Sequence, residues 1–174
     1  MADRSGQSVH IAVPDLDRAM IVHHVLRPDG MSQTMESGGE LPLHATALGK
    51  ILIAYRPGFR QDETGCTREA FTARTLTTPA VLARELAMVR GRGWAAEIGE
   101  YRRDRASIAA PIRFPNRSVV AAISVTGPVE EIASPAGQAS LIPRVRLAAA
   151  DIEHTLKGMY GAAVCHVVGT GHVS

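Results

Sequence analysis

The 174 residues predict an α+β domain built on an antiparallel sheet. Short strand-like runs open the chain, helical patterns fill its middle, and further strand-like runs precede a long last helix. Because strands group together instead of alternating with helices, this order argues against a doubly wound parallel sheet. Hydrophobic residues make up 45% of the chain but aromatic residues only 4%. Alanine and aliphatic side chains are therefore expected to form the core.

The opening of the chain predicts a meander of short strands over residues 8–14, 20–26 and 31–37, separated by turn-forming Pro, Asp and Gly residues. Side chains alternate between the two faces of a strand. In the first strand, one face receives Val9, Ile11 and Val13, and the other receives Ser8, His10 and Ala12.

Two helices are expected next. Residues 45–55 carry apolar side chains at helical spacing, and a Pro-Gly pair ends this helix. Thr78-Pro79 is typical of a helix start, and Gly91 and Gly93 end the second helix. Residues 59–76 between the two helices are polar and mixed, and predict short helices and loop.

Strands are expected again over residues 94–100, 105–113 and 118–126. The last two are apolar at nearly every position, which predicts a hairpin covered on both faces. A long helix over 138–160 follows, with its regular part starting near Pro143 and a frayed tail after Gly161. Its apolar stripe is Val145, Ala149, Ile152, Leu156 and Met159.

Hydroxyl groups interrupt the apolar hairpin. Ser107 lies in its first strand, and Ser124 and Thr126 share one face of its second strand. Simple pairing of the two strands would bring all three hydroxyls to the same face. A buried hydroxyl without a partner costs roughly 1–3 kcal/mol, so each must bond either to the protein itself or to a bound small molecule. The residues alone leave both alternatives open.

Composition and motifs argue against several classes of protein. The net charge of +2 does not demand a nucleic-acid partner. Cys66 and Cys165 form no disulfide or metal pattern, which favours reduced thiols in the cytoplasm. No apolar run approaches the ~20 residues of a membrane span, and the polar N-terminus lacks a signal peptide. No phosphate loop, nucleophile motif or metal-spaced histidine set occurs, so neither a metal nor a cofactor is expected.

Further segments form a recognisable series: Leu41–Lys50, Thr75–Pro79, Arg92–Ala95, Ser107–Ile112 and Val120–Pro128. Together they resemble the C-terminal effector-binding domain of the IclR-type transcriptional regulators, in order and spacing, from about residue 8 to residue 160. The resemblance implies a GAF-like (profilin-like) fold, a six-stranded antiparallel sheet flanked by helices. It also implies that residues 1–174 are a single effector-binding domain, because the winged helix-turn-helix of complete members has no room before Val9.

By this resemblance the chain is a ligand sensor and not an enzyme. It is expected to bind a small organic acid beside the sheet and to form a homodimer or homotetramer in the cytoplasm. Promoter DNA would be contacted only through the N-terminal domain that this chain lacks. Two other classes stay open: a small enzyme acting on an organic acid, and a purely structural dimerisation module.

Carried over by position, the resemblance implies these ligand-binding residues: Ala47, Leu48, Glu97, Ser107, Ser124 and Thr126. Backbone N–H groups at a helix start attract anions, which suits an organic acid. Met31, Met35 and Leu41 are expected to close the apolar end. Many relatives have Gly-Val-Arg-Cys where this chain has residues 104–107, Asp-Arg-Ala-Ser, and an aspartate where it has Glu97. The effector is therefore not expected to match that of any one relative.

Overall fold

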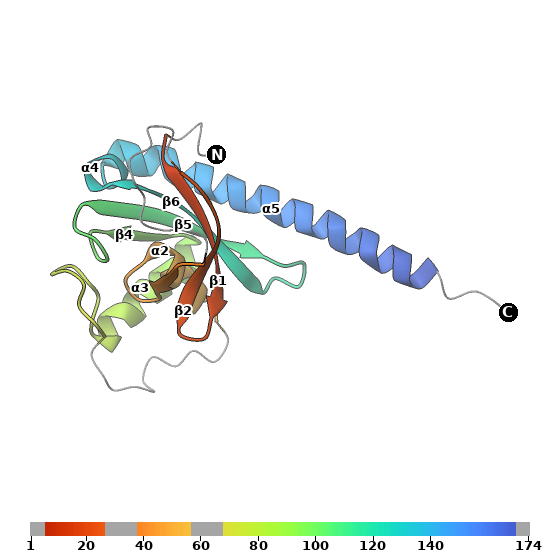
Figure 1. Cartoon of the computed structure of the whole chain (residues 1–174), viewed down its shortest axis with the longest axis horizontal. Coiled ribbons are helices and arrows are strands. Elements are labelled where there is room, and N and C mark those ends of the chain that lie inside the picture. The colour runs from red at the N-terminus through yellow and green to blue at the C-terminus, as the bar shows by residue number, and fades with distance from the viewer. Residues whose placement is uncertain (1–5, 27–37, 57–67, 170–174) are drawn as a thin grey trace.

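The computed structural model describes residues 6–26, 38–56 and 68–169, with side chains described as far as Tyr160. Its elements, in chain order, are β1 (Ser8–Asp15), β2 (Arg18–Val25), β3 (Glu40–Pro42), α2 (Ala47–Ala54), α3 (Pro79–Arg92), β4 (Ala95–Ile98), β5 (Arg105–Arg113), β6 (Val119–Pro128), α4 (Val129–Ile132) and α5 (Pro135–Gly169) (Figure 1). The strand predicted over 31–37, with Met31 and Met35, lies outside the described residues, as do residues 59–67 of the predicted loop.

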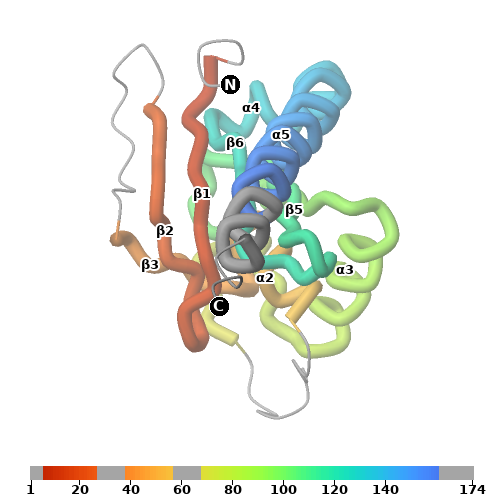
Figure 2. Tube along the Cα trace, turned by 90° about the vertical axis from the view of Figure 1, so that its right-hand side faces the viewer, coloured from red at the N-terminus to blue at the C-terminus, as the bar shows by residue number. Residues whose placement is uncertain are grey.

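Within the described residues the strands form one six-stranded antiparallel sheet in the order β3-β2-β1-β6-β5-β4. β1 and β6 pair in its middle, with Val9 opposite Val125, although they lie near opposite ends of the chain. Figure 2 shows β1 to β3 on one side of the molecule and β5 on the other. The predicted α+β class, a six-stranded antiparallel sheet flanked by helices, is confirmed.

The helices cover both faces of this sheet and divide the core in two (Figures 1 and 2). α2 packs on one face, and α3 packs against α2. α4 and α5 cover the opposite face. The α2 side of the core includes Ala12, Ile21, Leu48, Ile51 and Ala109, and the α5 side includes Val9, Ile108, Ile123, Val125 and Val145. We call these two surfaces of the sheet the α2 face and the α5 face.

A cap and a close backbone approach hold the start of α2 in place. The Thr46 hydroxyl accepts a hydrogen bond from the Gly49 N–H (3.1 Å) and donates one to the Pro42 carbonyl (2.8 Å). A side chain at Gly49 would overlap the backbone of Leu43, so only glycine allows this approach. All residues of α2 are buried, and Leu41 is buried in the same core. The first turn of α2 is therefore fixed against the end of β3.

The last helix differs from its prediction. α5 begins at Pro135, where the Ser134 hydroxyl accepts a hydrogen bond from the Gly137 N–H (2.9 Å), and it runs through Pro143. Pro143 is exposed, so water can bond the carbonyl that the proline leaves free. The frayed tail after Gly161 is also a wrong prediction, since α5 continues to Gly169. α5 extends past the sheet (Figure 1), which explains why Met159 of the predicted stripe is 66% exposed.

Candidate ligand site on the α2 face of the sheet

Polar side chains gather on the α2 face, at positions set by strand alternation and register. Glu97, Ser107, Thr126 and Ser8 are successive cross-strand partners on β4, β5, β6 and β1. In the neighbouring row, Ser124 of β6 lies opposite His10 of β1. All of these residues are less than a tenth exposed. We call this set the polar face: Ser8, His10, Glu97, Ser107, Ser124 and Thr126. The structure thus brings the three predicted hydroxyls and Glu97 together.

Glu97 is held by the protein itself. Its Oε1 accepts hydrogen bonds from the backbone N–H groups of Glu100 (2.6 Å) and Tyr101 (3.2 Å), and Ser107 Oγ donates to its Oε2 (3.2 Å). Burial raises the pKa of Glu97 to about 7, and the bonds from Tyr101, Glu100 and Ser107 oppose this rise. The Ser107 hydroxyl therefore has a partner within the protein, the Glu97 carboxyl group.

Ser124 and His10 lack such partners. Each is only 1% exposed, yet Ser124 Oγ and both ring nitrogens of His10 have no hydrogen-bond partner among the described residues. Burial, and to a smaller extent the nearby His24, lowers the pKa of His10 to about 4. The ring is therefore neutral at pH 7. Two uncompensated polar groups thus lie side by side at the centre of the sheet.

Sequence reasoning missed a buried ion pair beside this surface. Lys50 Nζ lies 2.6 Å from Glu100 Oε1 and donates to the Ala96 carbonyl at 3.0 Å, and the Lys50 side chain is 1% exposed. Burial raises the pKa of Glu100, while Lys50 acts to lower it. The signal for Lys50 was its place in an otherwise apolar helix, where helical spacing brings it inside. His10 had a signal as well, since it alternates with apolar residues on the same face as Ser8.

The start of α2 supplies N–H groups of a different kind. The first N–H groups of a helix have no earlier carbonyl within the helix to bond, and they carry part of its positive end charge. The N–H of Gly49 is taken by Thr46. Those of the buried residues Ala47 and Leu48 remain without a partner inside the helix. The groups that these two predicted site residues offer to an anion are therefore backbone N–H groups.

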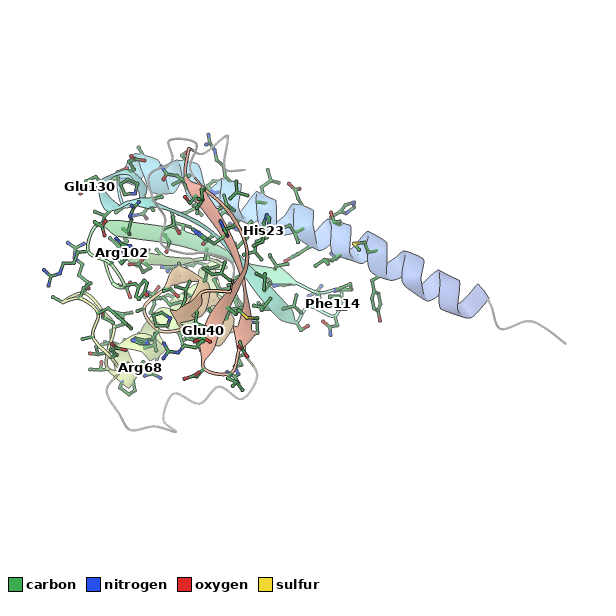
Figure 3. All side chains as sticks on the ribbon, viewed as in Figure 1. His23, Glu40, Arg68, Arg102, Phe114 and Glu130 are labelled. Atoms are coloured by element: carbon green, nitrogen blue, oxygen red, sulfur yellow. The ribbon has the colours of Figure 1, made fainter. Side chains whose placement is uncertain are left out.

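Other polar residues outside the polar face have structural surroundings. His44 Nε2 lies 2.9 Å from the Glu69 carbonyl, and its ring packs against Phe71. Asp104 pairs with Arg102 and Arg105 in an exposed turn, where Figure 3 labels Arg102. Within the described ranges no three His, Cys, Asp or Glu residues are placed to hold a metal ion. In the same ranges no helix has both the length and the apolar character to cross a membrane.

A cavity of about 520 Å³ lies elsewhere, between β5 and α5. Its charged lining includes Arg113 and Glu153, which already bond to each other through the Arg113 N–H (2.8 Å) and a side-chain contact of 3.7 Å. Its other lining residues include Ala110, Pro111 and Leu147. No unpartnered buried side chain of the described region lines this cavity. The polar face is therefore the better candidate for recognising a polar ligand.

Comparison with known proteins agrees with this architecture. The family described as bacterial transcriptional regulator IclR C-terminal matches residues 1–154 of the chain. The chain belongs to this family. It is 44% identical over 132 residues to a glycerol operon regulatory protein of Streptomyces coelicolor, covering 76% of this chain and 52% of that protein. The IclR-type domain thus spans about half the length of that relative.

Solved structures share the fold of this IclR-type domain. The IclR of Thermotoga maritima superposes with a TM-score of 0.81 at 25% identity, over 89% of this chain and 63% of that one. An IclR homologue from Microbacterium hydrocarbonoxydans, complexed with 4-hydroxybenzoate, superposes with a TM-score of 0.78 at 26% identity, over 90% of this chain and 63% of that one. These likenesses agree with an effector-binding domain of an IclR-family regulator.

Proposed function

We propose that this effector-binding domain senses a small organic acid at the polar face, between the start of α2 and the central strands. The observation that carries the proposal is the buried Ser124 hydroxyl, which has no hydrogen-bond partner within the described residues. Leaving such a group unpaired is unfavourable by roughly 1–3 kcal/mol. A ligand that bonds to Ser124 removes that cost, so binding and folding favour the same arrangement.

The acidic character of the ligand is inferred from the start of α2. The N–H groups of Ala47 and Leu48 and about half a positive charge at the helix end favour an anion. Lys50 is not available for this role because it is paired with Glu100. The bound 4-hydroxybenzoate of the Microbacterium homologue is an organic acid and supports this class of ligand. Thr126 and Leu41 are proposed to line the same site. Glu97 and Ser107 are proposed to form its wall.

The S. coelicolor relative extends the range of compounds to be tested. It is named as a glycerol operon regulatory protein. Metabolites derived from glycerol, such as glycerate and sn-glycerol 3-phosphate, therefore belong in a binding panel together with short aliphatic and aromatic acids. The relatives carry names of regulators, which favours sensing over turnover of these compounds.

A thermal-shift panel with the purified chain tests the proposal. An acid present at 100 times its Kd is expected to raise the free energy of unfolding by about 2.7 kcal/mol. Ser124→Ala is expected to weaken the binding of that acid by roughly tenfold to a hundredfold, which is the loss of one hydrogen bond to a charged ligand. Ser140→Ala, an exposed position on α5, is the matched control and should leave Kd unchanged. A broad panel without any shift would contradict the sensing function, and an unchanged Kd in Ser124→Ala would contradict this site.

We further propose that the ligand acts by favouring one dimeric or tetrameric arrangement, as differential affinity requires. The exposed Leu147 and Met159 of α5 are suitable contacts for self-association. Sedimentation with and without ligand tests this step, and a monomer at every concentration would contradict it. The chain itself is not expected to recognise a promoter, since its described elements form the effector-binding fold and not a helix-turn-helix. Sequence-selective binding of this chain to promoter DNA would disprove that expectation.

A further inference from the structure

His10 is a buried polar group that the proposed binding of an acid does not yet use. It lies on β1 directly opposite Ser124 of β6, and both residues are 1% exposed. Side chains of directly opposite residues start from Cβ atoms about 4.5–5.5 Å apart. Ser124 Oγ, His10 Nδ1 and His10 Nε2 therefore form one cluster of atoms without hydrogen-bond partners among the described residues. Such a cluster is larger than one unpaired hydroxyl and needs more than one bond to be satisfied.

The chemistry of the pair selects its complement. A neutral imidazole has one N–H donor and one acceptor nitrogen, and a serine hydroxyl both donates and accepts. A carboxylate or a fully ionised phosphate only accepts hydrogen bonds, so it cannot satisfy the acceptor nitrogen of His10. An alcohol or phenol hydroxyl has one proton to donate and lone pairs to accept, and can bond to both side chains at once.

The neutral state of His10 follows from its surroundings. Burial opposes a charge on the ring, and His24, the opposite residue on β2, opposes it to a smaller extent. The nearest carboxyl group of the polar face, Glu97, is held by its own backbone bonds and by Ser107. Lys50 is occupied by Glu100. The described groups around His10 thus leave it as a neutral donor and acceptor.

We propose that His10 and Ser124 form a subsite for a ligand hydroxyl, so that the effector is a hydroxylated acid. This inference rests on the proposed function and sharpens it. The acidic group is bound at the first turn of α2, and the hydroxyl is bound on the α2 face by the opposed side chains of β1 and β6. His10 then determines specificity, because a site built to bond a hydroxyl rejects the analogue that lacks it.

Calorimetry with paired probes tests the subsite. The pairs are lactate with propionate, 4-hydroxybenzoate with benzoate, and sn-glycerol 3-phosphate with propyl phosphate. At least one hydroxylated probe is expected to bind about tenfold or more tightly than its deoxy partner. His10→Phe keeps an aromatic ring but removes both nitrogens, and should lower that ratio severalfold, since only Ser124 is left to bond the hydroxyl. His23→Phe is the matched control, because His23 (labelled in Figure 3) is exposed and lies opposite Ile11 of the α5 face. It should leave the ratio unchanged.

A measurement on the unmodified chain covers the case in which His10→Phe fails to fold. The ring nitrogen signals of His10 in an NMR titration should move with the hydroxylated probe of a pair and stay in place with its deoxy partner. Equal affinities within every pair, or an equal response of His10 to both members, would overturn the subsite while the acid-sensing function stands. If none of the acids or phosphates binds, the proposed function and the subsite are both wrong.

Discussion

The α5 face and the α2 face of the sheet are made by alternate residues of the same strands, yet they bury different chemistry. The α5 face of β5 and β6 presents Ile108, Ile123 and Val125, all buried among aliphatic neighbours. The α2 face of these strands presents Ser107, Ser124 and Thr126. An apolar face lowers the free energy of the fold at every contact. A buried polar face lowers stability wherever its groups lack hydrogen bonds, and on this sheet Ser124 and His10 lack them within the described residues.

The comparison separates buried polar groups that bond within the protein from buried polar groups that do not. Within the polar face the two kinds occur side by side. Glu97 bonds to Ser107 and to the backbone, whereas Ser124 and His10 have no partner among the described residues. Burial alone therefore does not tell the two kinds apart, because both are buried and only the hydrogen-bond partners differ.

The largest loss of stability is expected when Lys50 is replaced. Lys50→Met leaves Glu100 buried without its cation, and breaking a buried pair in this way costs about 3–5 kcal/mol. Chemical denaturation at pH 7 measures it. The double variant Lys50→Met/Glu100→Gln removes both charges and should recover most of the loss. If Lys50→Met is as stable as the unmodified chain, the Lys50–Glu100 pair contributes nothing to the free energy of unfolding.

Ile108→Ala tests the α5 face. Ile108 is 1% exposed, and a substitution of this kind is expected to cost about 2–5 kcal/mol through lost contacts and a residual cavity. For a domain of this size, each kcal/mol lowers Tm by about 2–4 °C. The Kd of any acid that binds should change less than twofold in the folded variant. A large loss of affinity would mean that packing on the α5 face affects ligand binding on the α2 face.

A pH series separates His10 from Glu97. The pKa of His10 is about 4 in the fold against 6.5 unfolded, so the unfolded chain binds more protons between these values. The free energy of unfolding therefore falls by about 3 kcal/mol on this account as the pH drops from 6.5 to 4. Glu97, with a pKa of about 7 in the fold against 4.5 unfolded, acts in the opposite direction as the pH drops from 7 to 4.5. Burial also raises the pKa of Glu100, which adds to the effect of Glu97.

His10→Gln removes only the first of these contributions. Relative to the unmodified chain, the variant should gain about 3 kcal/mol of stability between pH 6.5 and pH 4, while the difference between the two stays constant above pH 7. Urea denaturation at half-unit steps of pH measures both profiles. Parallel profiles would mean that His10 titrates normally and is not buried as described.

The smallest change is expected for Ser124→Ala without ligand. The substitution removes an unpaired buried hydroxyl, so it should leave stability unchanged or raise it by about 1 kcal/mol. Ser107→Ala is the matched comparison, because its hydroxyl donates to Glu97 and its loss should lower stability by about 1 kcal/mol. An equal loss of stability in both variants would contradict the difference between the bonded Ser107 hydroxyl and the unbonded Ser124 hydroxyl.

Local patterns were enough to predict β1, β2, β4, β5 and β6, the two middle helices and the shared face of the hydroxyls. The alternation of side chains along β5 and β6 determines that face, and it does not depend on contacts with the rest of the chain. The sequence left open whether Ser107 bonds to the protein, and the geometry of its bond to Glu97 depends on the turn after β4, where Gly99 adopts φ 67°. The position of His10 opposite Ser124 depends on pairing between the two ends of the chain. Local sequence patterns cannot predict that Ser124 is the residue opposite His10.

The same limit explains the other misses. Lys50 has no acidic neighbour at helical spacing, and its partner Glu100 is brought to it only by the sheet. Pro143 predicts a helix start when residues are counted locally, but its exposed position on a well-packed helix tolerates the lost hydrogen bond. Short elements such as β3 and α4 carry too few residues to show a period. Tertiary contacts decide all of these features.

The pairing of β1 with β6 has a consequence for folding in time. During synthesis β1 leaves the ribosome before the other strands of the sheet, but the strand that covers one of its two edges is β6, which is made after nearly all the rest of the sheet. Until then that edge of β1 is open to wrong partners. Closing so distant a contact is slow compared with forming a hairpin. We therefore expect β1–β6 closure to be the late step in refolding, and a nascent chain that stops before β6 to need protection from aggregation.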